Sequence, residues 1–170
     1  NTKGVLLQVT ATMSPNEGTI GTQVTISGIG FGEKKGKVLI GGVATKIVKD
    51  GWKPDSIACT VTKAPSIGTH NVIIKPYKAD DIILSNAFTM KHPEIEYLDF
   101  YHDISGKPIV ITGKFFSTKK GKVYLEHPVS GKKKNCKVMS WGMGSITFVV
   151  PKASKSFPAG TYPLKVTNKV

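Results

Sequence analysis

The sequence predicts an all-β protein made of two tandem β-sandwich modules, on the basis of an internal repeat, alternating hydrophobicity and scattered turn residues. The chain of 170 residues has 18 Gly and 10 Pro spread along its length, which is typical of short strands joined by turns. A hydrophobic content of 39% with 21% charged residues favours packed cores over disorder. No apolar run approaches the ~20 residues of a membrane helix, so no transmembrane segment is predicted.

The repeat divides the chain into two copies. Residues 21–41 align without a gap on residues 106–126, and nine of the 21 positions are identical, among them KKGKV. SIACTV at residues 56–61 matches SITFVV at 145–150, and GTHNVII at 68–74 matches GTYPLKV at 160–166. The offset grows from 85 to 89 and then to 92, which places insertions of four and three residues in the second copy. We expect one domain over residues 1–91 and another over 92–170.

Within each copy, apolar side chains alternate with polar ones, as expected of strands with one buried face. In the first copy this holds for Val24 and Ile26, and in the second copy for Ile109 and Ile111. Trp52 and Trp141 each precede a Ser-Ile strand. They are expected to close the ends of the two cores.

The first copy also carries a specific set of motifs: Ser14-Pro15, Gly18, Gly21, TISG at residues 25–28, Phe31-Gly32, and Trp52 ahead of a Ser-Ile strand. With this set it resembles an IPT/TIG domain, the immunoglobulin-like module shared by plexins, Rel-type transcription factors and many bacterial surface proteins. The second copy departs from the pattern, because it lacks the Ser-Pro pair and the early Gly. The resemblance implies two immunoglobulin-like sandwiches and a non-catalytic structural or adhesive function outside the cell or at its surface.

The residues indicate no catalytic site, metal site or cofactor. The four histidines, His70, His92, His102 and His127, are isolated, and no metal-binding or nucleophile-elbow motif is present. Cys59 and Cys136 fall in different copies, which excludes a disulfide within a copy. Both are interpreted as small buried apolar residues.

The charge is strongly positive and consists entirely of lysine: 24 Lys, no Arg and 11 acidic residues give +13. Arg is the residue that forms bidentate hydrogen bonds to bases and phosphates. Because the chain has no Arg, no specific nucleic-acid partner is predicted. The lysines suit a solvated surface or contact with a polyanion, a glycan or a neighbouring copy. The predicted basic contact loops are Lys34, Lys35, Lys37, Lys119, Lys120, Lys122, Lys132, Lys133 and Lys134, and an acidic joint comprises Asp80, Asp81, Glu94, Glu96 and Asp99.

The two copies differ at their ends. The first copy continues past Ile74 into DDIILSNAFTMK at residues 80–91, which has the pattern of a closing strand, whereas the second copy has no counterpart of it. The chain opens with a segment whose apolar residues, Val5, Leu6, Leu7 and Val9, resemble that strand. One interpretation is an assembly strand that completes the second module of another copy and so builds a head-to-tail polymer. The alternative is that this chain is a piece of a longer multi-module protein.

Two other functions remain as alternatives, a carbohydrate-binding accessory module of a larger secreted protein and, less favoured, a DNA-binding module. The candidate sugar-stacking side chains are Tyr77, Tyr97, Tyr101 and Tyr124, and they form no evident row in the sequence.

The basic loops lead to a testable prediction. Replacing Lys119, Lys120 and Lys122 with Ser is expected to reduce retention on an anionic resin, because the loop loses three charges. The difference should fade near 1 M salt, where screening acts within ~3 Å. Salt-gradient chromatography of both proteins measures this, and retention unaffected by mutation and salt would contradict it.

Overall fold

The computed structural model describes residues 11–63, 65–99 and 105–169, and these residues form strands and loops without helices. The chain divides into two compact units, Asn1–Lys91 and His92–Val170, which we call the first and the second unit. The prediction of an all-β protein is confirmed. The described residues include no helix of the length and apolar character needed to span a membrane.

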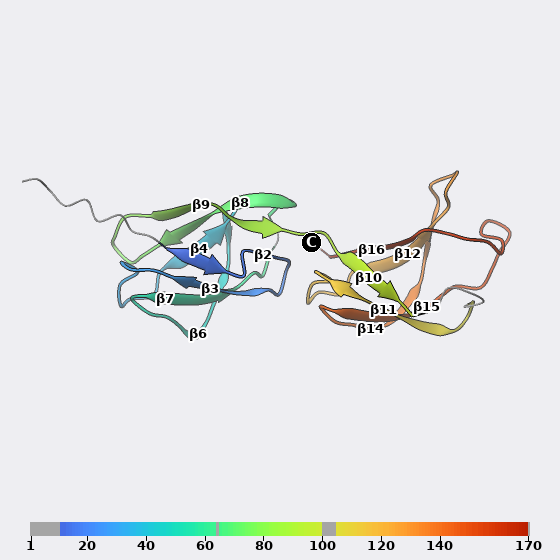
Figure 1. Cartoon of the computed structure of the whole chain (residues 1–170), viewed down its shortest axis with the longest axis horizontal. Coiled ribbons are helices and arrows are strands. Elements are labelled where there is room, and N and C mark those ends of the chain that lie inside the picture. The colour runs from blue at the N-terminus through green and yellow to red at the C-terminus, as the bar shows by residue number, and fades with distance from the viewer. Residues whose placement is uncertain (1–10, 64, 100–104, 170) are drawn as a thin grey trace, which may run out of the picture. The chain divides into compact units, whose positions relative to one another are not determined.

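The first unit contains two sheets (Figure 1). One has the order β1-β3-β7-β6 and the other β2-β9-β8-β4-β5. The strands are β1 Thr12–Ser14, β2 Glu17–Gly18, β3 Gln23–Ser27, β4 Lys37–Ile40, β5 Val43–Ala44, β6 Lys46–Trp52, β7 Ser56–Thr60, β8 Gly68–Lys75 and β9 Ile82–Met90.

The core of the first unit lies between these sheets and follows the predicted alternation. Val24 and Ile26 of β3 are fully buried, while their neighbours along the strand are exposed. The second sheet contributes Val72 and Ile74 of β8 to the same core. The closing strand predicted from residues 80–91 is β9, and its Phe88 and Met90 are also fully buried there. Strand β9 is therefore an integral part of the core.

The second unit repeats this arrangement with fewer strands. Its sheets have the orders β10-β11-β15-β14 and β13-β12-β16. Val123 pairs with Val166 as Val38 pairs with Ile74 in the first unit, so β12 and β16 correspond to β4 and β8. The strands are β10 Glu94–Leu98, β11 Pro108–Lys114, β12 Lys122–Glu126, β13 Lys133–Asn135, β14 Lys137–Trp141, β15 Ser145–Val149 and β16 Leu164–Thr167.

Each tryptophan joins a loop to its own core, as predicted. Trp52 donates its indole N–H to the carbonyl of Gly32 at 3.0 Å, and Trp141 donates to the carbonyls of Phe116 at 2.7 Å and Ser117 at 3.0 Å. Both indoles pack against the buried residues of their unit. The glycine of the shared KKGKV motif, Gly121 in the second unit, sits where a Cβ atom would collide with the carbonyl oxygen of Thr167 and crowd the Trp141 ring.

These contacts predict a large effect of Trp141→Ala on the second unit alone. We expect a loss of about 3 kcal/mol of stability, because a core-lining ring leaves a void and two carbonyls lose a donor. Scanning calorimetry, with Trp52 fluorescence reporting the first unit, measures the change. Trp52→Ala is the matched control and should leave the second unit's transition in place; a neutral Trp141→Ala would contradict the assignment.

Candidate functional site

The second unit has an open sheet edge where the first unit is closed. In the first unit, β8 pairs with β4 on one side and β9 on the other. In the second unit, β16 pairs with β12, and among the residues that the structure describes no strand pairs with its other edge (Figure 1). Such an edge offers backbone N–H and C=O groups to an added strand.

An apolar cavity of about 390 Å³ adjoins this edge. Gly160, Thr161 and Tyr162 contribute to its lining. In the aligned repeat these residues correspond to Gly68, Thr69 and His70, which pair with Met90, Thr89 and Phe88 of β9. The larger apolar side chains of the lining are Leu98, Ile109, Leu125, Val150, Phe157 and Leu164. The cavity therefore lies where the first unit holds Phe88 and Met90.

The burial of equivalent side chains supports this correspondence. Val72 and Ile74 of β8 are both 0% exposed. Their counterparts on β16, Leu164 and Val166, remain half-buried although they point toward the core. The exposed surface of these two side chains is apolar and would gain free energy from a covering strand.

Phe157 and Tyr162 form one wall of the cavity, and the ring of His127 packs against both of them. The Phe157 ring centroid lies 5.9 Å from that of His127 and 5.4 Å from that of Tyr162, and the His127 and Tyr162 centroids are 5.9 Å apart. The Tyr162 hydroxyl donates to the carbonyl of Pro158 at 2.8 Å. The Nδ1 atom of His127 accepts from the backbone N–H groups of Val129 and Ser130, each at 3.3 Å. These contacts hold the rings in place without an added strand, so binding of a strand need not order them.

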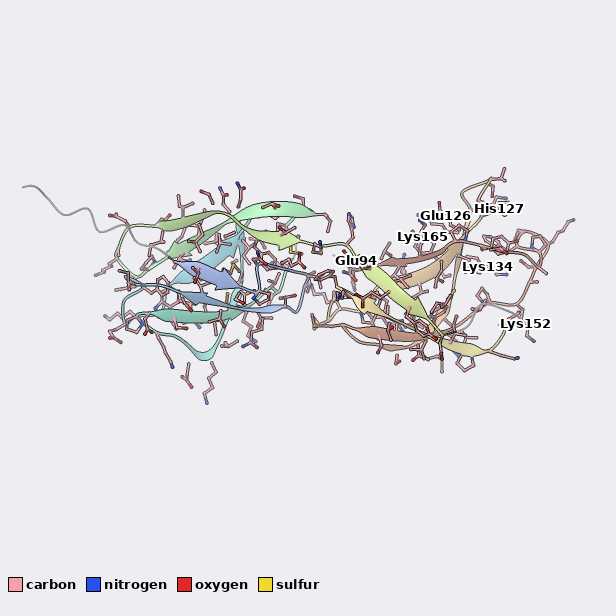
Figure 2. The ribbon with its side chains drawn as sticks, viewed as in Figure 1. Glu94, Glu126, His127, Lys134, Lys152 and Lys165 are labelled. Carbon is pink, nitrogen blue, oxygen red and sulfur yellow. The ribbon has the colours of Figure 1, made fainter. Side chains whose placement is uncertain are left out.

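Lys134 ties the loop that carries Phe157 to β13. Its ammonium donates to the carbonyl of Lys152 at 2.7 Å and to Ser154 Oγ at 3.0 Å, and it lies 5.6 Å from the Phe157 ring centroid. Backbone bonds between Ser154 and Phe157 in both directions tighten the same loop. Figure 2 labels Lys134 and Lys152, together with His127 and Lys165, in the second unit.

The sequence alone did not identify this wall or the cavity. The signal available was that the segment ahead of Gly160, which contains Phe157, is three residues longer than its counterpart in the first copy. An insertion, however, does not reveal on which side of a sandwich its side chains lie. The apolar residues of the cavity were recognisable only as core positions.

The predicted basic contact loops are distributed over both units, and their function stays a prediction. Lys34 lies 5.1 Å from the centroid of the Tyr77 ring, and Lys133 lies 4.8 Å from that of Tyr124. Lys120 donates to the carbonyl of Val138 at 3.2 Å. These ammonium groups lie over rings or donate to a backbone carbonyl of β14, and they remain accessible to anions. The remaining members, Lys35, Lys37, Lys119, Lys122 and Lys132, are exposed.

The acidic joint and the assembly strand also stay predictions. Asp81 pairs with Lys75 in the first unit, and Glu96 pairs with Lys114 in the second. Asp80 and Asp81 belong to one unit and Glu94, Glu96 and Asp99 to the other. The assembly strand residues, Val5, Leu6, Leu7 and Val9, lie outside the described residues.

Both cysteines are buried and unpaired, as interpreted from the sequence. Burial raises the pKa of the Cys136 thiol to about 11. Burial also raises the pKa of Cys59, partly offset by a hydrogen bond with Thr45. Few thiolates form near neutral pH, so both thiols are expected to react slowly. Within the described residues, no group of three or more His, Cys, Asp or Glu side chains is arranged to hold a metal ion.

Several solved structures resemble this chain at low sequence identity, and each match covers only part of the other protein. The Plexin A4 full extracellular region is 19% identical, with a TM-score of 0.47, over 86% of this chain and 13% of that one. The surface glycan-binding protein PbSGBP-B from Prevotella bryantii is 15% identical, with a TM-score of 0.41, over 89% and 35%. An auxiliary nutrient binding protein from Bacteroides thetaiotaomicron is 21% identical, with a TM-score of 0.41, over 88% and 39%.

This chain therefore spans well under half the length of each of these proteins. No curated protein matches it. Among protein families, the IPT/TIG domain matches residues 9–91. That range ends where the first unit ends, after the closing strand β9. Together with the fold and the motifs around Gly28 and Trp52, the match identifies the first unit of this chain as a member of the IPT/TIG family.

Proposed function

We propose that the protein is a non-catalytic structural or adhesive module, located outside the cell or at its surface, that assembles by strand complementation. An extended segment of another copy adds to the open edge of β16 and places apolar side chains in the adjoining cavity. Repetition of this contact from copy to copy forms a head-to-tail filament.

The observation that carries the proposal is the cavity beside β16, at the position of Phe88 and Met90 in the first unit. An apolar cavity of roughly 150 Å³ takes up a benzene ring, so about 390 Å³ has room for more than one apolar side chain. Fully burying one Phe, Leu or Met contributes about 1.5–3 kcal/mol. Two such side chains, with backbone pairing along β16, offset the ordering of a short strand.

The glycan alternative has weaker support from the described residues. Tyr77 and Tyr97 are each more than half exposed but belong to different units. Tyr124 is 8% exposed and lies beneath Lys133, so its ring offers no stacking face. Tyr101 lies outside the described residues. No observation favours DNA binding over general attraction of anions by lysine.

Supplying the missing strand within the chain tests the proposal. In the first unit, residues 76–81 connect Lys75 to Ile82. Thr167 corresponds to Lys75, so a copy of residues 79–91 fused directly after Val170 restores the same spacing. We expect this protein to remain monomeric by light scattering, with the second unit's melting temperature raised by at least ~5 °C, equivalent to about 1 kcal/mol.

The matched control is the same fusion with Asp in place of the residue copied from Phe88. A buried carboxylate opposes insertion of the strand, so the control should retain the original melting temperature and the original assembly. If the second unit has the same melting temperature in the fusion, in its control and in the unmodified protein, the edge does not accept a strand.

Removing the opening segment tests where the added strand comes from. Deletion of residues 1–7 is expected to abolish self-association in sedimentation experiments at high protein concentration, while the first unit melts unchanged. Leu7→Asp is a point control that should weaken assembly without shortening the chain. A truncated protein that still forms filaments, or a full-length protein that stays monomeric at high concentration, would rule out the head-to-tail filament.

A further inference from the structure

We infer that the strand received by the second unit is a short segment, residues 3–7 of another copy, in one defined register: Leu7 opposite Gly160, Leu6 opposite Thr161 and Val5 opposite Tyr162. Val5 then takes the place that Phe88 has in the first unit, and Leu7 takes the place of Met90. The inference rests on the proposed function and specifies its partner segment.

The connection between the two units of one chain, together with the alternation of side chains, limits the register. Met90 is the last inward residue of β9, and residues 91–94 separate it from Ile95, which pairs with Gly113. Gly113 corresponds to Gly28, whose position is packed against Ala11. Ala11 therefore corresponds to Ile95. The same four-residue connection counted back from Ala11 reaches Leu6, and a connection of three residues reaches Leu7. Only the shorter connection turns Val5 and Leu7 toward the core, in place of Gly4 and Leu6, because side chains alternate along a strand.

Two other observations exclude later registers. The IPT/TIG match begins at Val9, so the segment that precedes the matched range ends at Gln8. Thr12 and Met13 pair with Ser27 and Ile26 of β3. If Val5 lay opposite Val166, as Ile82 lies opposite Ile74, regular pairing would require Ala11 to reach Gly160 of the other copy. Ala11 already packs at Gly28.

The size of the cavity agrees with the smaller residues of this register. In the first unit, β9 supplies Phe88 and Met90 to the core. In the second unit, the inserted loop supplies Phe157, which is 6% exposed and lines the cavity beside Tyr162. Because this ring already occupies part of the space, Val and Leu fit where Phe and Met fit in the first unit.

The middle position of the register faces away from the core. Thr89 lies opposite Thr69 in the first unit, and their hydroxyl oxygens are 3.2 Å apart. The corresponding pair between two copies is Leu6 with Thr161. Residues directly opposite each other in an antiparallel pair have Cα atoms roughly 4.5–5.5 Å apart, which is within the range that a disulfide spans.

Cysteine cross-linking tests the register directly. The double variant Leu6→Cys/Thr161→Cys is oxidised during assembly and separated on a non-reducing gel. We expect a ladder of covalent oligomers that collapses on reduction. The matched variants Gly4→Cys/Thr161→Cys and Gln8→Cys/Thr161→Cys displace the donor cysteine by two positions and should give at least fivefold less ladder. Each single-cysteine variant controls for the native thiols, which are buried.

The possible outcomes distinguish a wrong register from a wrong proposed function. A dominant ladder for Leu6→Cys/Thr161→Cys supports the inference. A stronger ladder for either displaced pair, or filaments without any ladder, overturns the register while strand complementation stands. If the variants and the unmodified protein are monomeric and the fused strand raises no melting temperature, the proposed function itself fails, and the inference fails with it.

Discussion

The pairing of strand β9 with β8 closes the core of the first unit. In the first unit, β9 pairs along nearly the whole of β8 and places Phe88 and Met90 over the residues contributed by the other sheet. In a domain of this size, a single strand carries a large share of the buried surface. The second unit keeps the corresponding β16 but, among its described residues, no strand that covers it. The open edge, the cavity and the half-buried Leu164 and Val166 all follow from this one difference.

Much of the fold was predictable because it follows from local alternation. The pattern around Val24 and Ile26, and around Ile109 and Ile111, defines the buried faces of β3 and β11 without any knowledge of their partners. The repeat established the equivalence of the copies, and the alignment showed that residues 80–91 have no counterpart in the second copy of the given sequence. The lining of the cavity was not predictable, because it depends on how the inserted loop before Gly160 folds back. The hydrogen bonds of Lys134 to Lys152 and Ser154, and the edge-on contact of the Phe157 ring with His127, join residues far apart in sequence.

The lysines are a second case in which the composition indicates one role and the structure shows another. A net charge of +13 suggests a surface devoted to anions. Several of these lysines also cover apolar or polar groups of the protein itself. Lys133 lies over Tyr124, which is 8% exposed although its side chain stands on the outer face of the sheet. Because a lysine stem is apolar and its ammonium group stays in water, one residue serves both purposes.

The loops after β3 and β11 have a consequence for recognising relatives of the second unit. Gly30 and Gly32 adopt φ angles of 84° and 71°, and their counterparts Phe115 and Ser117 keep φ angles of 61° and 57° without being glycine. This left-handed backbone is unfavourable for residues with a Cβ atom, and here Asn168 donates to the carbonyl of Phe115 while Ser117 donates to that of Lys119. The two loops thus share a backbone path although they do not share the glycines. A search that required glycine at these positions would pass over the second unit, although its loop conformation and its tryptophan contact match those of the first unit.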